Sequence, residues 1–581
     1  MVHPGHPIPR PHIRPAVLEA RERLAQGREK LRRQHEAGSP GIQVCNRLAT
    51  LVDEIVVDLF AAMLADMDGD VAARLRPHVA LVPFGGYGRC DVAPFSDVDL
   101  MLLYHARVAA DVPALAKRIV TDLGDAGLAL GFNARRPEDA CRLALSDATI
   151  LTGLSESRFL AGSQELYDRF AARFKRQVMR RWRRLTPMIE EARREERAKF
   201  GETVYLLEPN IKRSRGGLRD IQLIRWIGFV RFGESHPDAL ERAGRLSKRD
   251  AKVLRDATEF LLRTRNEMHF SADKARDLLD RREQVRLAEV NQYPGSEAVL
   301  PVERFMQEYF LHTTEVRNIA ADICRRARPR SVAEVLDPLI GINMEGDFRI
   351  GPSGISATRR GMPKVQNDLA QVLRLMDLAN MTGKRIGNRT WEAIRQSMMA
   401  REDVFLTDDA MKRFLSLLSR PGQLGDLLRR LHELRVLEKV IPDFKHARNL
   451  LQFNEYHKLT VDAHCIRAVE VCSEFQNHPG RLGQVYRSIN QKRTLHLALL
   501  LHDLGKGFPE DHSDVGRRIA VAMAQRLKLP LREARRVEFL VHKHLVMSHL
   551  AFRRDTSDEE VIVKFAVEVG SPDRLKMLYV L

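Results

Sequence analysis

The sequence is poor in cysteine and has no long apolar segment, and both absences narrow what the protein can be. Six cysteines occur among 581 residues, and none belongs to a Cys-x-x-Cys pair. This spacing argues against a disulfide framework or a zinc ribbon and suits a reducing cytoplasm. No apolar run approaches the ~20 residues of a membrane span, and the opening segment MVHPGHPIPRPHIRP lacks the apolar core of a secretory signal. We therefore expect a cytoplasmic protein that does not enter a membrane.

Basic residues outnumber acidic ones. Lys and Arg together number 95, Asp and Glu number 77, and the formal net charge is +18. This excess favours anionic partners such as nucleotides, RNA or an acidic protein surface, although an arginine-rich solvated surface produces the same count. Hydrophobic residues make up 44% of the chain, which is enough for a sizeable core.

Hydrophobic periodicity divides the chain into a short mixed segment and a long helical remainder. Ala16–Ala65 has helical spacing, the apolar runs His78–Phe84 and Val98–Tyr104 predict strands, and Ala114–Ala126 predicts a helix. This alternation is typical of a small α/β domain. The spacing that follows is helical almost throughout, except for the Pro- and Gly-punctuated segment 329–363, which we interpret as irregular.

The segment between the two predicted strands, FGGYGRCDVAPFSDVDL, carries the first group of residues suited to chemistry. Gly85 and Gly86 let backbone N–H groups approach a phosphate closely, and a helix that begins there adds partial positive charge. Arg89 is a candidate for a full positive charge. Ser96 is a candidate hydrogen-bond donor to a phosphate oxygen. These residues predict a nucleotide-binding turn.

Two aspartates follow the turn at the start of the second predicted strand. Asp97 and Asp99 are two residues apart, and residues at that spacing on a strand point to the same face. Two carboxylates on one face beside a phosphate cradle suit Mg²⁺, which nucleotidyl transfer needs to bind triphosphate oxygens and offset their charge. Strand, diglycine and Asp-x-Asp together are far more specific than an isolated Asp-x-Asp, and they predict a catalytic transferase site.

The pattern GGYGR…P-x-SD-x-DL resembles the motif of DNA-polymerase-β-like nucleotidyltransferases, and closely that of PII uridylyltransferases. The resemblance implies transfer of UMP from UTP, with Mg²⁺, to a tyrosine of the PII signalling protein. One departure is local, because the family usually has Gly-Glu after the arginine where this chain has Cys90-Asp91. The resemblance also implies a third carboxylate nearby, and the sequence leaves three candidates open: Asp122, Asp147 and Glu156.

A second segment narrows the family. LLEPNIKRSRGGLRDIQ, at Leu206–Gln222, reads as a polar loop followed by a helix, and it resembles the helical region that follows the transferase domain in PII uridylyltransferases. Phe260–Phe270 and Phe305–Asn318 resemble further stretches of the same region. Three basic residues of the first segment are either ligands or loop-packing charges, and the sequence does not decide between these: Lys212, Arg215 and Arg219.

Histidines gather around a His-Asp pair towards the end of the sequence. His502-Asp503 follows the apolar run LHLALLL, and further histidines lie on both sides of it. Imidazole and carboxylate groups from separate helices bind a divalent metal or a metal pair, which activates water for phosphoester hydrolysis. Lys506 is a candidate contact for a phosphate oxygen. The predicted metal ligands are His464, His502, Asp503, His512 and His544. The expected surface histidines are His457, His542 and His549.

The segments YHKLTVDAH, LLHDLGKG, DHSDVG and HLVMSH resemble the HD phosphohydrolase superfamily, and also the uridylyl-removing domain of the same enzyme family. The resemblance implies Mg²⁺ or Mn²⁺ at this site and hydrolytic removal of UMP from PII, with glutamine as effector. HD sites usually end with a further Asp, expected just after the LYVL at which the sequence stops. Since the paired ACT sensing domains are also absent, we expect a fragment of a longer protein.

The predicted fold class is α+β, predominantly α. The chain is expected to divide into a disordered and helical extension (1–44), a polymerase-β-like nucleotidyltransferase α/β domain (45–165), a helical domain of the PII-uridylyltransferase type (166–330), a helical linker region (331–445) and an all-α HD phosphohydrolase domain (446–581), the last of them truncated.

Two other functions fit part of the sequence. A tRNA or poly(A) nucleotidyltransferase with an appended HD domain would share the first motif and use the positive charge, but the segments after that motif do not resemble such enzymes. Nucleic acid is therefore not an expected partner. A non-catalytic scaffold would have no need of Asp97, Asp99, His502 and Asp503, all of which are present.

Overall fold

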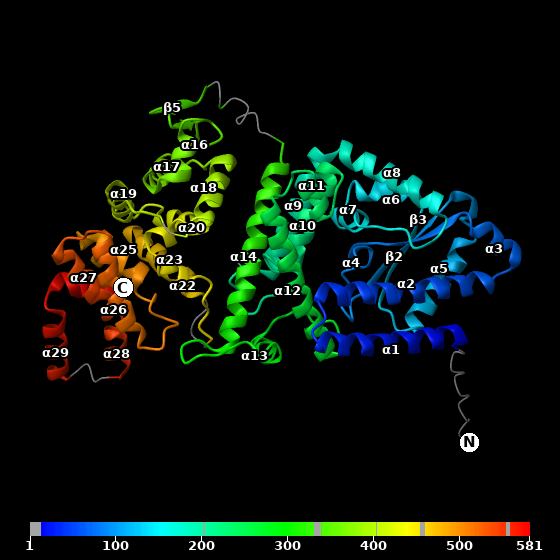
Figure 1. Ribbon diagram of the computed structural model, residues 1–581, viewed down its shortest axis with the longest axis horizontal. Helices are drawn as coiled ribbons and strands as arrows, with labels where there is room; N and C mark the ends of the chain where they lie inside the picture. Colours follow the sequence, from blue (N-terminus) through cyan, green and yellow to red (C-terminus); the bar gives the residue numbers. More distant parts are fainter. Residues whose placement is uncertain are drawn as a thin grey trace, which may run out of the picture. The chain divides into compact units, whose positions relative to one another are not determined.

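The computed structural model describes residues 13–201, 204–329, 337, 340–402, 404–453, 459–553 and 558–581 (Figure 1). The chain forms two compact units, of which unit 1 comprises residues 1–287 and 309–328 and unit 2 comprises residues 288–308 and 329–581. Each unit has an apolar core of its own. Within the described residues, every helix is too short or too polar to cross a lipid bilayer.

Unit 1 begins with two long helices, α1 (Pro15–Glu36) and α2 (Gly41–Ala65), which lie side by side (Figure 1). The apolar side chains of α2 recur every three to four residues and are buried, as the periodicity predicts. Helix α2 also packs on α12 (Lys248–Ala272) and α5 (Val112–Asp125). The N-terminal helices are thereby built into the core of the unit.

The described part of unit 1 contains a four-stranded sheet in the order β3-β2-β1-β4. Strand β1 (Val79–Pro83) is antiparallel to β2 (Val98–Tyr104) and to β4 (Ala161–Gly162), whereas β2 is parallel to β3 (Leu130–Arg135). The two strands predicted from apolar runs are confirmed as β1 and β2, and the helix predicted at Ala114–Ala126 is α5, which connects β2 to β3.

The other helices of unit 1 surround this sheet and extend from it. Helix α8 contacts β1 and β2, and α9 contacts α10. Helices α13 and α14 contribute residues to both units by the division given above. The bounds of these other helices are α3 (Gly69–Leu75), α4 (Gly85–Gly88), the 3₁₀ helix η1 (Ala106–Val108), α6 (Pro137–Ala144), α7 (Ala148–Leu154), α8 (Gln164–Arg180), α9 (Trp182–Phe200), α10 (Leu218–Phe232), α11 (Pro237–Arg242), α13 (Arg281–Val290) and α14 (Pro301–Ala327).

Unit 2 contains a small antiparallel sheet where the sequence indicated irregular structure. Its strands are β5 (Ile342–Met344), β6 (Phe348–Ile350) and β7 (Ile355–Ala357), in that order. Each strand has three residues, which is too short for an alternating pattern to be recognised in a sequence.

Helices make up the rest of the described part of unit 2. Helix α25, which carries the LHLALLL run, packs on α19, α23 and α27, and all its residues from Thr494 to Leu501 are buried. The bounds are α16 (Gly361–Asn367), α17 (Leu369–Thr382), α18 (Asn388–Ala400), α19 (Asp408–Leu418), α20 (Leu424–Glu433), α21 (Leu437–Val440), α22 (Phe444–Ala447), α23 (Val461–Glu474), the 3₁₀ helix η2 (Phe475–Asn477), α24 (Arg481–Ser488), α25 (Lys492–Leu501), α26 (His512–Arg526), α27 (Leu531–His542), α28 (Val546–Arg553), α29 (Glu559–Val569) and α30 (Pro572–Val580). The predicted fold class, α+β and predominantly α, is confirmed.

Candidate active sites

The diglycine turn follows directly from β1. Phe84 ends the strand as the N-cap of α4, a single helical turn that begins at Gly85. Gly85 has φ +57°, and a Cβ atom there would lie 2.8 Å from Oδ2 of Asp99. Glycine is needed here both for its left-handed backbone and for its lack of a side chain. The turn is held against β2 by a hydrogen bond from Phe84 N to Asp99 O at 3.1 Å.

The two aspartates lie at the start of β2. Asp97 directly precedes the strand and is exposed, whereas Asp99 is its second residue and half-buried. Asp99 pairs in register with Gly131 of β3, and a Cβ at Gly131 would lie 2.6 Å from Asp99 Oδ1. The Asp99 carboxylate therefore occupies space that two glycines, one on each side, leave open.

Electrostatics at these aspartates favour a bound cation. Burial raises the pKa of Asp99, and the neighbouring charge of Asp97 raises it further. Repulsion between two such carboxylates is relieved by a divalent ion, and oxygen ligands are those that Mg²⁺ prefers. Asp97 and Asp99 thus have the ligand chemistry that magnesium requires.

Arg89, predicted to supply a full positive charge to phosphate, is paired with two acids. Its Nε donates to Asp91 Oδ2 at 2.7 Å, and its Nη1 forms an ion pair with Glu156. Glu156 in turn accepts from Arg225 Nε at 2.9 Å. Arg89 lines the nucleotide cavity, but two carboxylates already neutralise its guanidinium, so it braces the turn.

The third carboxylate expected from the resemblance is not among the three candidates. Asp122 pairs with Arg14, Asp147 caps α7 by accepting from Ile150 N at 2.9 Å, and Glu156 is taken up by its two arginines. None of the three lines the cavity that contains Asp97 and Asp99. The acids that do line it, besides that pair, are Asp91 and Asp277.

A cavity of about 370 Å³ brings the diglycine turn and the aspartates together with a basic wall. Among the described residues, its lining includes all the transferase residues predicted from the sequence, namely Gly85, Gly86, Arg89, Ser96, Asp97 and Asp99. It also includes four cations from later in the chain, namely Lys212, Arg213, Arg219 and Arg265. The sequence left Lys212 and Arg219 undecided and did not point to Arg213 or Arg265.

The basic wall is partly desolvated. Burial, together with the nearby charges of Arg265 and Arg219, lowers the pKa of Lys212 to about 8. Such crowding of like charges is relieved by a polyanion. Arg265 also donates from Nη2 to Ser96 Oγ at 3.1 Å and from Nε to Asp277 Oδ1 at 2.7 Å, which joins α12 to the segment before β2. A cavity lined by both carboxylates and cations suits a triphosphate with its metal.

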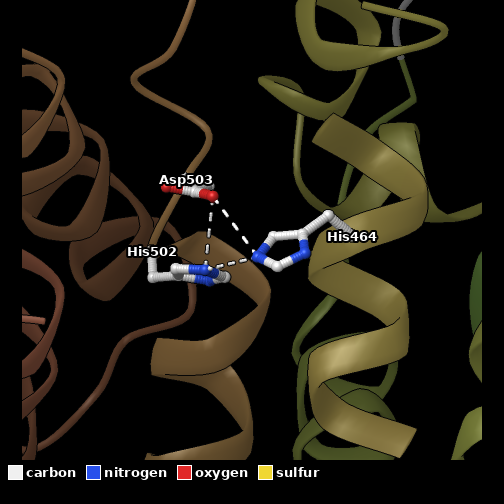
Figure 2. A group of neighbouring side chains, drawn as sticks. All are labelled: His464, His502 and Asp503. Carbon is white, nitrogen blue, oxygen red and sulfur yellow. Dashed lines mark hydrogen bonds and ion pairs between the residues drawn. The ribbon is translucent and has the colours of Figure 1, made fainter. Parts of the chain in front are cut away.

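The second site lies in unit 2 and collects side chains from several helices. His464 is on α23, His502 is the C-cap of α25 with Asp503 next to it, His512 begins α26, and His544 follows α27. The ligand atoms of His464, His502 and Asp503 all lie within 4.8 Å of one another (Figure 2), and so do those of Asp503, His512 and His544. The structure thus brings all five predicted ligands together around Asp503.

The inner distances are short enough for one ion to join the groups. His464 Nε2 lies 3.3 Å from His502 Nε2 and 3.5 Å from Asp503 Oδ2, while His502 Nε2 lies 3.4 Å from the same carboxylate oxygen (Figure 2). On the other side, His544 Nε2 lies 3.7 Å from Asp503 Oδ1. Asp503 faces histidines with both of its oxygens.

Backbone carbonyls orient two of the imidazoles. Leu499 O lies 2.8 Å from His502 Nδ1, and Val541 O lies 2.7 Å from His544 Nδ1. A carbonyl accepts a proton only from an N–H, so each ring carries its hydrogen on Nδ1 and presents the Nε2 lone pair to Asp503. Within the described part of the chain, the buried Nε2 atom of His544 has no hydrogen-bond partner, as expected of a metal ligand.

The charge states also suit a metal. Burial lowers the pKa of His502 to about 4 and also lowers the pKa of His464 and His544, so all three rings are neutral at pH 7. Although burial opposes ionisation of Asp503, the Lys506 ammonium, whose Nζ lies 2.7 Å from Oδ2, holds the pKa of this carboxyl well below its usual range. Neutral imidazoles and an ionised carboxylate are the forms that bind a divalent cation.

Lys506, the predicted phosphate contact, lies beside Asp503. Its Nζ lies 2.7 Å from Asp503 Oδ2, and the side chain is buried. Lys506 therefore positions the Asp503 carboxylate. Of the expected surface histidines, His549 is exposed and His542 is partly exposed beside Asp514, whereas His457 lies outside the described residues.

The two sites define a class of protein, a nucleotidyltransferase combined with an HD-type phosphohydrolase. Comparison with family models agrees with this assignment, because the HD domain matches residues 461–566 and the GlnD PII-uridylyltransferase model matches residues 183–324. The GlnD match precedes the HD match along the chain, and together the two matches are those of a GlnD-type PII uridylyltransferase. The GlnD match, at residues 183–324, includes the basic residues of the transferase cavity from Lys212 to Arg265. The family resemblance is confirmed, and HD domains bind divalent metals.

Proposed function

We propose that the protein transfers UMP from UTP to a tyrosine of the PII regulatory protein and removes it again by hydrolysis. One observation carries the proposal: Asp97 and Asp99 share a cavity with Lys212, Arg219 and Arg265, while a separate His/Asp cluster lies in unit 2. Opposed reactions with different nucleophiles and leaving groups need two such sites. UTP and PII as substrates are inferred from the family match.

In the transfer reaction, the tyrosine oxygen attacks the α-phosphorus, the bond to the β-phosphate oxygen breaks, and pyrophosphate leaves while the phenol loses its proton. Asp97 and Asp99 would hold Mg²⁺, which would offset the negative charge that develops on the phosphates. The backbone at Gly85 and Gly86 lies close to the triphosphate. Lys212, Arg219 and Arg265 face the departing pyrophosphate and stabilise its charge.

In the removal reaction, water attacks the phosphorus, the bond to the tyrosine oxygen breaks, and UMP and the free tyrosine result. A divalent cation bound here, Mg²⁺ or Mn²⁺, would supply the acidity that turns water into a nucleophile. His464, His502, His512 and His544 would hold it through ring nitrogens, and Asp503 would hold it through its carboxylate. Lys506 keeps that carboxylate ionised and in position.

The same family relation supports a role in nitrogen sensing. We propose that the protein acts in the cytoplasm and that glutamine, the effector in the family, sets the balance between the two reactions where the ACT sensing domains absent from this sequence are present. The domain boundaries at residues 45, 166, 331 and 446 also remain predictions, to be tested by limited proteolysis.

Incubation of the protein with PII, UTP labelled on its α-phosphate and Mg²⁺ tests the transferase proposal. Label is expected on PII, and Asp97→Asn with Asp99→Asn is expected to abolish labelling because both carboxylates hold the metal. Asp70→Asn, which changes an exposed acid that does not line the cavity, serves as the matched control. If the double variant labels PII as fast as the parent, or if the protein extends labelled tRNA and ignores PII, the proposal is wrong.

A further inference from the structure

A second basic cavity in unit 1, of about 210 Å³, lies between helices and shares no described lining residue with the transferase cavity. Six arginines line it, together with a single described carboxylate, Glu190. The arginines are Arg194 and Arg197 of α9, Arg215 of the loop before α10, and Arg317, Arg325 and Arg328 at the end of α14.

Helical spacing explains why so many guanidinium groups converge. Glu190, Arg194 and Arg197 are separated by four and three residues and so lie on one face of α9. On α14 the residues that line the cavity are Arg317 and Arg325 and, between them in sequence, the small residues Ala320, Ala321 and Cys324. These small side chains leave the volume that the longer arginines surround.

The positive charge in this cavity is only partly compensated. Arg328 pairs with Glu190 at 2.9 Å, Arg194 with Glu191 at 2.7 Å, and Arg325 with Asp322 at 3.3 Å. Within the described residues, Arg197 has no carboxylate partner, and the buried Nε of Arg325 has no hydrogen-bond acceptor. Burial raises the pKa of Cys324 to about 12, so this thiol is neutral and does not offset the charge.

We propose that this cavity binds a small phosphate-bearing anion at a site distinct from the UTP site. Arginine forks match the oxygens of phosphate in two-point contacts, and several of them around a small concave space favour a compact dianion. This inference does not depend on which nucleotide or protein substrate the enzyme uses.

The site also has a structural route to the transferase cavity. In the loop before α10, Lys212 and Arg213 line the transferase cavity, whereas Arg215 lines the second one. Arg193 of α9 holds this loop by donating to Arg213 O at 2.9 Å and Ser214 O at 3.2 Å. An anion that draws α9 and α14 together therefore also fixes the loop that presents Lys212, and we expect it to alter the transferase rate.

Equilibrium dialysis with labelled inorganic phosphate, without divalent metal, tests the proposal on the full chain. The parent protein is expected to show saturable binding, and Arg197→Gln with Arg325→Gln is expected to weaken it by ~10-fold or more. Arg326→Gln is the matched control, since Arg326 neighbours Arg325 on α14, carries the same charge and does not line the cavity. Lys212→Gln is expected to leave this binding unchanged, which separates it from phosphate held in the transferase cavity.

Competition by pyrophosphate and by UMP then distinguishes free phosphate from a phosphorylated molecule as the ligand. Thermal unfolding of each variant verifies that it is folded. Equal weakening by Arg325→Gln and Arg326→Gln would mean a diffuse ion atmosphere and would overturn the proposal. Binding by the double variant with the affinity of the parent would overturn it as well.

Discussion

A single methyl group added at Gly131 tests the geometry of the transferase site. Its Cβ would lie 2.6 Å from Asp99 Oδ1, which is closer than a carbon and an oxygen atom tolerate. Gly85 bounds the same carboxylate on its other side, so Asp99 cannot keep its place and has to turn or shift by roughly 0.5–1 Å. Because a displacement of about 1 Å in a catalytic group costs about 100-fold, we expect Gly131→Ala to lower the rate of UMP transfer by roughly that factor.

The fold should survive this substitution. Alanine in a strand loses less conformational entropy than glycine, which favours folding by roughly 0.5–1 kcal/mol, while the tight contact costs about 1–3 kcal/mol. The net loss of about 2 kcal/mol or less leaves the protein folded, as thermal unfolding would verify. Gly124→Ala is the control, because Gly124 lies in α5 and a Cβ there has no atom within 4 Å in the described structure.

The assay measures label transfer to PII at saturating UTP and Mg²⁺, with UMP release from uridylylated PII measured in parallel. Gly131→Ala is expected to slow transfer and to leave release unchanged, since Asp503 and its histidines lie in the other unit. Folded Gly131→Ala protein that transfers UMP within about twofold of the parent rate would refute the placement of Asp99 as a metal ligand.

Three further predictions concern other parts of the chain. Cys90 has φ 61°, a left-handed conformation that costs a residue with a side chain roughly 1 kcal/mol. Cys90→Gly should therefore raise the free energy of unfolding, measured by urea denaturation, by about that amount. A decrease would contradict the left-handed backbone at this position. Burial lowers the pKa of His496 to about 4, so the unfolded state binds more protons than the folded state between pH 6.5 and 4. The free energy of unfolding should therefore fall by up to ~3 kcal/mol as the pH drops through that window. His496→Gln should flatten this slope, and an unchanged slope would count against the role of His496. Mn²⁺ is expected to raise the melting temperature of the parent protein, and Asp503→Asn should abolish this rise. The same variant should no longer release UMP from PII, while UMP transfer continues. His549→Ala is the unaffected control, and release by Asp503→Asn at the parent rate would exclude Asp503 as a ligand.

The residues that could be predicted from the sequence are those whose chemistry is local. Gly85, Gly86, Asp97 and Asp99 lie within one short segment, and the polarity of that segment contrasts with the apolar strands on both sides. The HD-type ligands are farther apart, yet His502-Asp503 stands out because it ends a buried apolar helix. In both cases a polar group appears where periodicity predicts burial.

The residues that could not be predicted reach the site through tertiary structure. Gly131 is one of 35 glycines and belongs to the strand LGFNAR, whose short alternation of Leu130, Phe132 and Ala134 indicates a strand but does not reveal which side chain the glycine faces. Arg265 and Asp277 come from α12 and the segment after it, more than 160 residues beyond the aspartates. The pairing of Arg89 with Glu156 was equally hidden, since an arginine near a phosphate-binding turn has the same sequence signature whether or not a distant acid binds it.

The buried triad Arg89–Glu156–Arg225 has a consequence for how this site can change over evolution. The Glu156 side chain is fully buried between the two guanidinium groups, and loss of one member of such a group leaves an unpaired charge at a cost of about 3–5 kcal/mol. No single replacement is tolerated cheaply, whereas a simultaneous exchange for apolar residues can be neutral. We expect an alignment of relatives to show correlated substitution at positions 89, 156 and 225, even though the last two lie outside the sequence motif.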